Sequence, residues 1–348
     1  MTEFWAGKTV LLTGHTGFKG SWMSLWLHEM GAKVYGYALE PDTTPSLFDQ
    51  LGLDDIIHHK IGDICDRDTL TNYIIQVKPD VIFHMAAQSL VLRGYKDAPL
   101  TWDVNVMGTV NILETLRHLD HPCTAVMITT DKVYHNNEWE HGYREDDPLG
   151  GLDPYSASKA ACELAISSYS FIYDHEERPI RVASARAGNV IGGGDWCANR
   201  LVPDIARALQ NEESIETRNP GATRPWQHVL EPLDGYMCLA EKLSQNSDIG
   251  TAFNFGPAAR DNRTVENVIQ TALKYWPGHY HTTSVNNAPH EAGLLKLSIE
   301  RAQSRLGWSP RWSFEIAIDK TISWYKLVHE GADPLHVTRA HIVDYQNT

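Results

Sequence analysis

The chain opens with short apolar runs that alternate with longer amphipathic stretches. A β-branched apolar run over 8–13 ends at Gly14, a helical pattern follows over 19–30, and a second strand pattern covers 32–39. This order predicts a strand–helix–strand unit with parallel strands. Further strand patterns, separated mostly by stretches of helix length, recur at 56–62, 81–86, 124–130 and 180–187. The alternation predicts an α/β fold built on a doubly wound parallel sheet.

After Gly194 the pattern becomes irregular, with frequent prolines and tryptophans and only scattered helical stretches, such as 203–210 and 267–275. The regular alternation of helix and strand resumes with a helical pattern over 231–243 and a strand pattern over 251–255. We therefore expect a Rossmann-type sheet domain that interleaves with a smaller, mixed C-terminal substrate lobe. The expected boundaries are 1–194 plus about 229–256 for the sheet domain, and 195–228 plus 257–348 for the lobe.

Composition narrows the class of protein. Of 348 residues, 42% are hydrophobic and 21% are charged, values typical of folded globular proteins. The formal net charge of −14 disfavours nucleic acid and anionic membrane as partners. No basic, apolar leader opens the chain, so we expect a cytoplasmic protein. The five cysteines form no C-x-x-C pair and the histidines show no ligand spacing, so neither a disulfide nor a metal is expected.

The turn between the first strand and its helix carries regularly spaced glycines. Gly14, Gly17 and Gly20 give the spacing G-x-x-G-x-x-G. Glycine permits a tight turn and lets a pyrophosphate approach the backbone, while the helix N-terminus favours negative charge. A glycine turn alone is weak evidence, because tight strand–helix packing also favours it. We interpret it as a dinucleotide site that includes the intervening residues His15, Thr16, Phe18 and Lys19.

Residues after the next strands complete the predicted cofactor pocket. An acidic side chain after the second strand binds ribose hydroxyls in NAD sites. The candidates are Glu40, which we take as the ribose ligand, and Asp42. No arginine lies in 35–42 to meet a 2′-phosphate, so NAD is favoured over NADP. The carboxyl ends of the third and fourth strands add Asp63, Ile64, Ala86 and Ala87.

A tyrosine and a lysine stand four residues apart at the start of a helical stretch. Tyr155 and Lys159 therefore fall on one helix face. The reference pKa of tyrosine, about 10, is too high for a base at neutral pH, but an adjacent ammonium and a nicotinamide cation both favour the phenolate. By itself the pair is more often a half-buried aromatic beside a solvated lysine. Joined to the glycine turn, it predicts proton removal from an alcohol while the cofactor takes a hydride.

These motifs resemble the extended short-chain dehydrogenase/reductase family over nearly the whole chain. The resemblance implies an NAD-binding Rossmann domain, a smaller nucleotide-sugar lobe and a catalytic set of threonine, tyrosine and lysine. The threonine corresponds to Thr130. The resemblance also implies that Tyr155 and Lys159 touch the cofactor, that Asn105 lies near it, and that two helices of the Rossmann domain form a homodimer.

Five separated stretches look like those of the 4,6-dehydratases of that family that act on CDP-D-glucose. The resemblance implies a lyase that oxidises C4 with a bound NAD, eliminates water across C5 and C6, and returns the hydride to C6. The product is CDP-4-keto-6-deoxy-D-glucose, in deoxysugar biosynthesis such as that of lipopolysaccharide O-antigen. The stretches are TGHTGFKGSW at 13–22, TTDKVY at 129–134, RAGNVIGGGDW at 186–196, RPWQHVLEP at 224–232 and LGWSPRW at 306–312.

The resemblance implies that the two residues after Thr130 catalyse the elimination. It implies that Asp131 assists departure of the C6 hydroxyl and that Lys132 acts near C5. The thymidine-diphosphate relatives have Asp-Glu here, whereas this chain has Asp-Lys. A neutral Lys132 can accept a proton, but a charged Lys132 keeps Asp131 ionised. The sequence leaves open which group carries which proton.

The remaining site residues are expected to hold the nucleotide sugar. Arginine presents a planar fork to phosphate, and glutamine, serine and asparagine can reach hydroxyls. The predicted substrate contacts are Gln88, Ser89, Asn189, Arg200 and Arg224.

Three alternative functions remain open at this point. A nucleotide-sugar 4-epimerase would use Thr130, Tyr155 and Lys159 without needing Asp131 and Lys132. A 4,6-dehydratase that acts on another nucleotide sugar is the second alternative. A non-catalytic NAD-sensing regulator could dispense with the tyrosine and lysine, which this chain retains.

Overall fold

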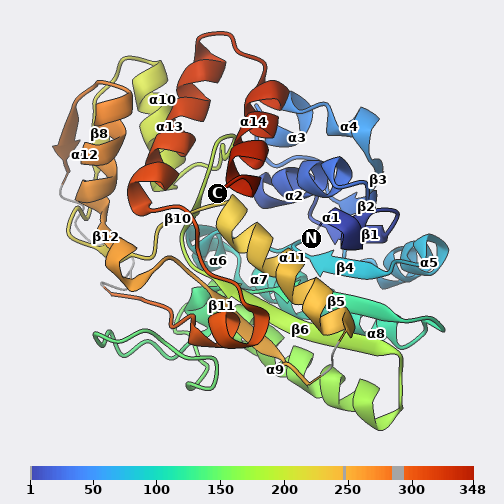
Figure 1. Ribbon diagram of the computed structural model, residues 1–348. Helices are drawn as coiled ribbons and strands as arrows, with labels where there is room; N and C mark the ends of the chain where they lie inside the picture. Colours follow the sequence, from blue (N-terminus) through green and yellow to red (C-terminus); the bar gives the residue numbers. More distant parts are fainter. Residues whose placement is uncertain (1, 246–247, 284–293) are drawn as a thin grey trace.

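The computed structural model describes residues 2–245, 248–283 and 294–348 (Figure 1). Its centre is a seven-stranded sheet in the order β11-β6-β5-β4-β1-β2-β3, in which every pairing is parallel. The order reverses between β1 and β4, the point at which open α/β sheets bind ligands. The strands are β1 Thr9–Thr13, β2 Lys33–Ala38, β3 His58–Ile61, β4 Val81–His84, β5 Cys123–Ile128, β6 Ile180–Ala187 and β11 Ala252–Phe255.

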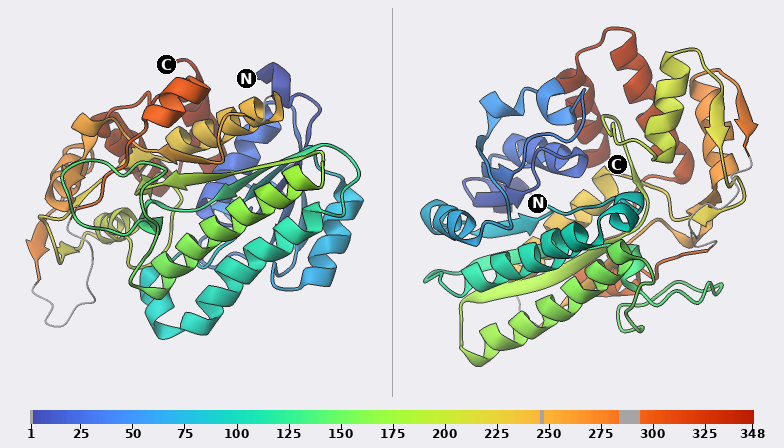
Figure 2. Two further views of the ribbon diagram at one scale, coloured as in Figure 1. Left: turned by 90° about the horizontal axis from the view of Figure 1, so that it is seen from below. Right: turned by 180° about the vertical axis from the view of Figure 1, so that it is seen from behind.

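Helices cover both faces of this sheet (Figure 2). Alternate strand residues point to opposite faces, so Leu11 joins one buried cluster while Val10 and Leu12 join the other. The predicted doubly wound parallel sheet is confirmed. One face carries α5 (Arg67–Val77), α8 (Gly108–Leu116) and α9 (Pro154–His175), and the other carries α2 (Phe18–Glu29) and α11 (Leu230–Gln245).

Beyond β6 the chain builds a smaller part from helices and two-stranded pairs. Strand β13 pairs with β8 in parallel, whereas β12 pairs with β9 antiparallel, so this part is mixed. Its elements are β7 Val190–Ile191, α10 Leu201–Gln210, β8 Ile215–Thr217, β9 Thr223–Arg224, β10 Gln227–His228, β12 Arg263–Thr264, α12 Val265–Tyr275, β13 Tyr280–Thr282, α13 Phe314–His329 and α14 Pro334–Gln346. Short α-helices elsewhere are α1 Thr2–Trp5, α3 Leu47–Gln50, α4 Leu53–Ile56, α6 Val91–Lys96 and α7 Ala98–Trp102.

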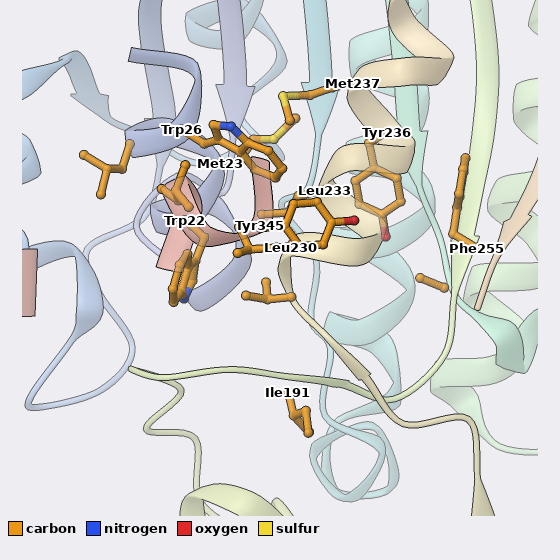
Figure 3. Packing of buried hydrophobic residues seen from close by; sticks show 14 of the residues in the cluster. Trp22, Met23, Trp26, Ile191, Leu230, Leu233, Tyr236, Met237, Phe255 and Tyr345 are labelled. Atoms are coloured by element: carbon orange, nitrogen blue, oxygen red, sulfur yellow. The ribbon is translucent and has the colours of Figure 1, made fainter. Parts of the chain in front are cut away.

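The C-terminal part is more helical than its pattern indicated. Helices α13 and α14 span 16 and 13 residues. Several buried positions of α14 are polar or amphipathic, among them Thr338, His341 and Tyr345, so no apolar stripe marks the helix in the sequence. It packs instead on α2, where the Tyr345 ring meets the Trp26 ring edge to face at 5.6 Å (Figure 3). No helix in the described ranges is both long and apolar enough to cross a membrane.

Candidate active site

The glycine turn lies between β1 and α2, beside the carboxyl end of β4. Gly14 has φ +77°, and a Cβ there would lie 2.7 Å from the Ala86 amide nitrogen. A Cβ on Gly20 would lie 2.1 Å from the Gly14 carbonyl oxygen. The N-cap of α2, Gly17, forms no side-chain cap, so N–H groups of the first turn are available to an anion. The structure thus brings together Gly14, Gly20 and Ala86.

The turn is fixed to the end of β2 by its own side chains. The Thr16 hydroxyl donates to the Leu39 carbonyl at 2.8 Å. The His15 ring is fully buried beneath Gly36, where a Cβ would lie 2.4 Å from it. Burial, with a smaller effect of nearby His59, lowers the pKa of His15 to about 3, so the imidazole is neutral.

Both acidic candidates for the ribose lie on the exposed segment just after β2. Glu40 is exposed just after β2, and no ion pair engages it within the described residues. Asp42 is paired with Arg93 at 3.5 Å, which makes it the less available carboxylate. Asp63 accepts from the Cys65 amide at 2.8 Å, and Ile64 is buried against the start of α8.

Tyr155 and Lys159 lie on the first turns of α9, which Asp153 caps by accepting from the Ser156 amide at 3.0 Å. Both side chains are buried, with 8% and 5% of their surface exposed. The Lys159 ammonium donates to the Ile128 carbonyl at the end of β5, at 3.2 Å. Burial raises the pKa of Tyr155 to about 12, against a smaller lowering by Thr130, and burial lowers the pKa of Lys159. The phenol is therefore protonated until another cation arrives beside it.

Thr130, Asp131 and Lys132 form a hydrogen-bonded group directly after β5. The Thr130 hydroxyl donates to Asp131 Oδ1 at 2.9 Å, and Lys132 Nζ lies 3.4 Å from the same oxygen. Asp131 is 1% exposed, whereas the Lys132 side chain is 33% exposed. The second oxygen, Asp131 Oδ2, is buried without a hydrogen-bond partner among the described residues. Such an oxygen is costly to leave unpaired, so this position calls for a partner that the described residues do not supply.

The residues after β4 are held by a buried polar cluster. Asn105 accepts from the Gln88 amide at 2.9 Å and donates to the Gln88 carbonyl and the Ser158 hydroxyl. The Gln88 side chain donates to Thr101 at 2.9 Å. Asn105 and Gln88 therefore brace the β4 loop against α9, and their predicted contacts with cofactor and substrate remain predictions.

Three predicted substrate residues come from the segments after β6. Arg200 is ion-paired with Asp195 at 3.0 Å and donates to the Ser89 hydroxyl at 3.0 Å, so it joins the β4 loop to the start of α10. Asn189 has a buried side-chain oxygen without a hydrogen-bond partner in the part of the chain described. Arg224 is 9% exposed and donates to the Thr223 carbonyl.

Comparison with known proteins decides the family. The family model of GDP-mannose 4,6-dehydratase matches residues 11–321. The chain is 46% identical to CDP-glucose 4,6-dehydratase of Salmonella typhimurium over 99% of this chain and 98% of the relative.

The chain belongs to the GDP-mannose 4,6-dehydratase family.

Solved structures with the same fold include a 4,6-dehydratase and epimerases. The dTDP-glucose 4,6-dehydratase of Bacillus anthracis, in complex with NAD, has a TM-score of 0.77 at 21% identity, covering 94% of this chain and 99% of that one. A UDP-glucose 4-epimerase of Stenotrophomonas maltophila, with bound NAD, has a TM-score of 0.81 at 18% identity, covering 93% and 100%. At these identities the likeness is one of fold.

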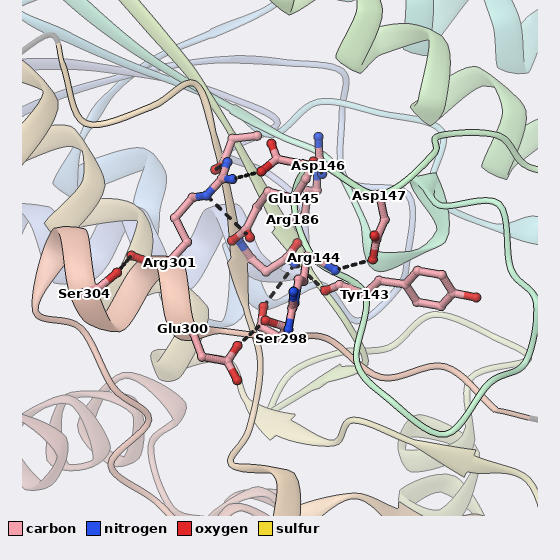
Figure 4. A network of polar contacts seen from close by, with 12 residues as sticks. Tyr143, Arg144, Glu145, Asp146, Asp147, Arg186, Ser298, Glu300, Arg301 and Ser304 are labelled. Atoms are coloured by element: carbon pink, nitrogen blue, oxygen red, sulfur yellow. Dashed lines mark hydrogen bonds and ion pairs between the residues drawn. The ribbon is translucent and has the colours of Figure 1, made fainter.

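This dehydratase-family site has a buried support that sequence reasoning missed. Glu163 accepts from Ser184 at 2.6 Å and Arg186 at 2.7 Å, and also from the Thr129 hydroxyl. The Arg186 guanidinium also donates to the Tyr134 hydroxyl at 2.8 Å and to the Glu145 carbonyl at 2.9 Å (Figure 4). The network fixes the end of β5 just before Thr130, Asp131 and Lys132. Its spacing in the sequence could have indicated this role, because Glu163 lies one turn beyond Lys159 on the same face of α9.

Proposed function

We propose that this protein converts CDP-D-glucose to CDP-4-keto-6-deoxy-D-glucose and water. The proposal rests mainly on four residues at the carboxyl edge of the sheet, near the glycine turn. They are Thr130, Asp131, Tyr155 and Lys159. An alcohol dehydrogenase needs only the tyrosine–lysine pair. Asp131, buried with one unpaired oxygen, adds the group that an elimination needs. The identity of 46% to a CDP-glucose 4,6-dehydratase supports the same reading.

The turn fits a dinucleotide, because Gly14 and Gly20 let the backbone pack tightly and Gly17 puts no side chain over the first N–H groups of α2. NAD bound there supplies the acceptor of the C4 hydride and its donor to C6. The cofactor residues we assign are Gly14, His15, Thr16, Gly17, Phe18, Lys19, Gly20, Glu40, Asp63, Ile64, Ala86, Ala87, Asn105, Tyr155 and Lys159.

Tyr155 and Lys159 serve the oxidation at C4. Tyr155 takes the proton of the C4 hydroxyl, and the Lys159 ammonium, one turn further along α9, favours the phenolate. The Thr130 hydroxyl turns from Asp131 Oδ1 and donates its hydrogen bond to O4 as negative charge develops there. Oxidation makes the C5 hydrogen acidic, because it then lies next to a carbonyl group.

Asp131 and Lys132 serve the elimination as one proton-carrying pair. Their resting form is an ion pair, with Nζ and Oδ1 3.4 Å apart. Moving one proton from Lys132 to Asp131 gives a neutral amine and a neutral acid with no change in total charge. The amine then accepts the C5 proton while the acid protonates the departing C6 hydroxyl as water. Both groups return to their resting charges, so the elimination needs no outside proton. When the hydride returns to C6, the proton that C5 takes up balances the one that Tyr155 removed from the C4 hydroxyl.

Arg200, Ser89, Asn189, Arg224 and Gln88 are assigned to the nucleotide sugar. Arg200 offers a guanidinium that already bridges the β4 loop and α10, which suits it to a diphosphate. The unpaired Asn189 oxygen can accept a bond from a sugar or ribose hydroxyl.

The test is incubation of the purified protein with CDP-, dTDP-, GDP- and UDP-glucose without added NAD. We expect a 4-keto product, detected by its alkali-induced absorbance, from CDP-glucose above all others. Turnover of another nucleotide sugar alone would refute the assigned substrate. A product inverted at C4 that keeps its C6 hydroxyl would indicate a 4-epimerase instead.

We also propose a homodimer through α9. Leu164 and Phe171 are seven residues apart on this helix, and 65% and 71% of their surfaces are exposed. A second copy of the chain would cover this face. Light scattering of Leu164→Glu should report a monomer, whereas the control Leu152→Glu, in a loop and 95% exposed, should leave the mass unchanged. With the proposed substrate, we also propose that the protein is cytoplasmic and acts in deoxysugar biosynthesis such as that of O-antigen.

A further inference from the structure

A buried ion pair joins α9 to β6. Glu163 Oε2 lies 2.7 Å from Arg186 Nη2, and the two side chains are only 3% and 4% exposed. Replacing a buried ion pair by well-packed apolar side chains is often neutral for stability, or even stabilising. Packing therefore does not require charged groups at this position, and the hydrogen bonds of the pair indicate what the charges add.

The carboxylate of the pair holds the first residue of the stretch 129–134, which we call the catalytic segment. Glu163 accepts a hydrogen bond from the Thr129 hydroxyl, and Thr129 lies between two groups of the site. The carbonyl of the preceding Ile128 accepts from the Lys159 ammonium at 3.2 Å, and the next residue is the one assigned to O4. The Thr129 bond therefore restrains both of these groups.

The guanidinium of the pair holds the other end of the catalytic segment. Asp131–Val133 form a short 3₁₀ turn, and Tyr134 follows it, 1% exposed. Arg186 donates to the Tyr134 hydroxyl at 2.8 Å, and that hydroxyl donates to Asn254 on β11 at 2.7 Å. The turn that contains the proton-carrying pair is thus held at both ends by the two members of one ion pair.

We propose that the Glu163–Arg186 ion pair positions the catalytic segment for two different steps of the reaction. Its bond to Thr129 sets the geometry of the oxidation at C4, and its bond to Tyr134 sets the geometry of the elimination. Both members of the pair are buried, so they act through the segment and not on the sugar. The proposal rests on the proposed function, because it assigns the two ends of the segment to the two steps of that reaction.

The first experiment follows reduced nicotinamide during a single turnover of CDP-glucose by the NAD-loaded enzyme. Thr129→Val keeps the shape of the side chain but loses the hydroxyl. It should slow the appearance of reduced nicotinamide about 10- to 100-fold, the cost of misplacing a reacting group by about 1 Å. The steady-state kcat should fall while KM changes little, because the substrate contacts are intact. Thr129→Ser retains the hydroxyl and should recover most of the rate.

The second experiment applies the same assay to the other end of the segment. Tyr134→Phe keeps the ring but removes the hydroxyl that accepts from Arg186. Reduced nicotinamide should appear at close to the wild-type rate, because the Thr129 bond is intact. Its decay should be about 10- to 100-fold slower, because the hydride returns only after water has left.

Ser184→Ala is the matched control for Thr129→Val. The Ser184 hydroxyl donates to the same carboxylate at 2.6 Å, but it comes from β6 and not from the catalytic segment. The control should lower the urea midpoint of unfolding, as Thr129→Val does, while both phases keep the wild-type rate. The exposed control Lys33→Met should match the wild type in every measurement.

The outcomes separate this proposal from the proposed function. Wild-type kinetics in either Thr129→Val or Tyr134→Phe would overturn the proposal, as would slowing of the same phase by both. It is also overturned if Ser184→Ala loses as much rate as Thr129→Val, because the pair then serves folding alone, or if Thr129→Ser is no faster than Thr129→Val. A wild-type enzyme that forms no 4-keto product from CDP-glucose would instead contradict the proposed function.

Discussion

Replacing Lys132 by methionine isolates the elimination from the oxidation. In the wild type, Lys132 Nζ lies 3.4 Å from Asp131 Oδ1, and only the lysine of this pair reaches solvent. Methionine keeps the length of the side chain but removes the amine that accepts the C5 proton. General acid–base groups contribute about 10²- to 10⁴-fold to rate, so we expect kcat to fall by this factor, equivalent to about 3–5 kcal/mol. Tyr155 and Lys159 remain intact, so oxidation at C4 should still proceed.

The assay is a single turnover followed by the near-ultraviolet absorbance of reduced nicotinamide. The wild type should show only a transient signal, whereas Lys132→Met should accumulate reduced cofactor, because the hydride cannot be returned until water has left. Lys132→Glu restores a base beside Asp131, and its turnover should lie between those of the wild type and Lys132→Met. The control Lys33→Met should behave as the wild type.

Two results would refute this reasoning. Unchanged turnover of Lys132→Met would remove the lysine from the chemistry. Failure of reduced nicotinamide to appear in a folded Lys132→Met protein with bound NAD would place the lysine in the oxidation step instead.

Three further predictions test the site and its support. Tyr155→Phe should lower kcat at least 100-fold without accumulation of reduced nicotinamide, and a transient like that of the wild type would contradict the role of the phenol. Glu163→Gln leaves buried Arg186 without its counter-ion and should lower the free energy of unfolding in urea by about 3–5 kcal/mol; a loss below about 1 kcal/mol would argue against this support. Burial raises the pKa of Glu231 from 4.5 to about 7 in the folded state, so its contribution to stability is complete below about pH 4.5 and is lost as pH rises through 7. The stability of the wild type relative to Glu231→Gln should therefore fall by up to about 3 kcal/mol between about pH 5 and pH 8, and a pH-independent difference would refute it.

Much of the fold was predictable because its signals are local. The apolar run before Gly14 and the helical pattern after it predicted β1 and α2 to within one or two residues. Strand β6 matches its predicted range of 180–187. Helix α14 was not predictable in this way, because it buries polar and amphipathic side chains against α2, a contact between the two ends of the chain.

In the candidate site, too, local spacing was predictable and contacts between distant segments were not. Spacing identified Tyr155 and Lys159 as neighbours on one helix, because four residues make about one helical turn. It did not identify Glu163 as the acceptor of Arg186, since that contact joins α9 to β6. Nor did it show that Lys19 faces Tyr236, more than two hundred residues away in the chain.

By itself the sequence determined the strand–helix alternation, the glycine turn and the tyrosine–lysine pair, because each depends on residues within a few positions of one another. Only the tertiary structure decided that Asp131 is buried with one oxygen unpaired while Lys132 keeps contact with water. Burial and pairing depend on what distant segments bring to the same place. They set the desolvation and the charge around each group, and these in turn decide which side chain can hold a proton.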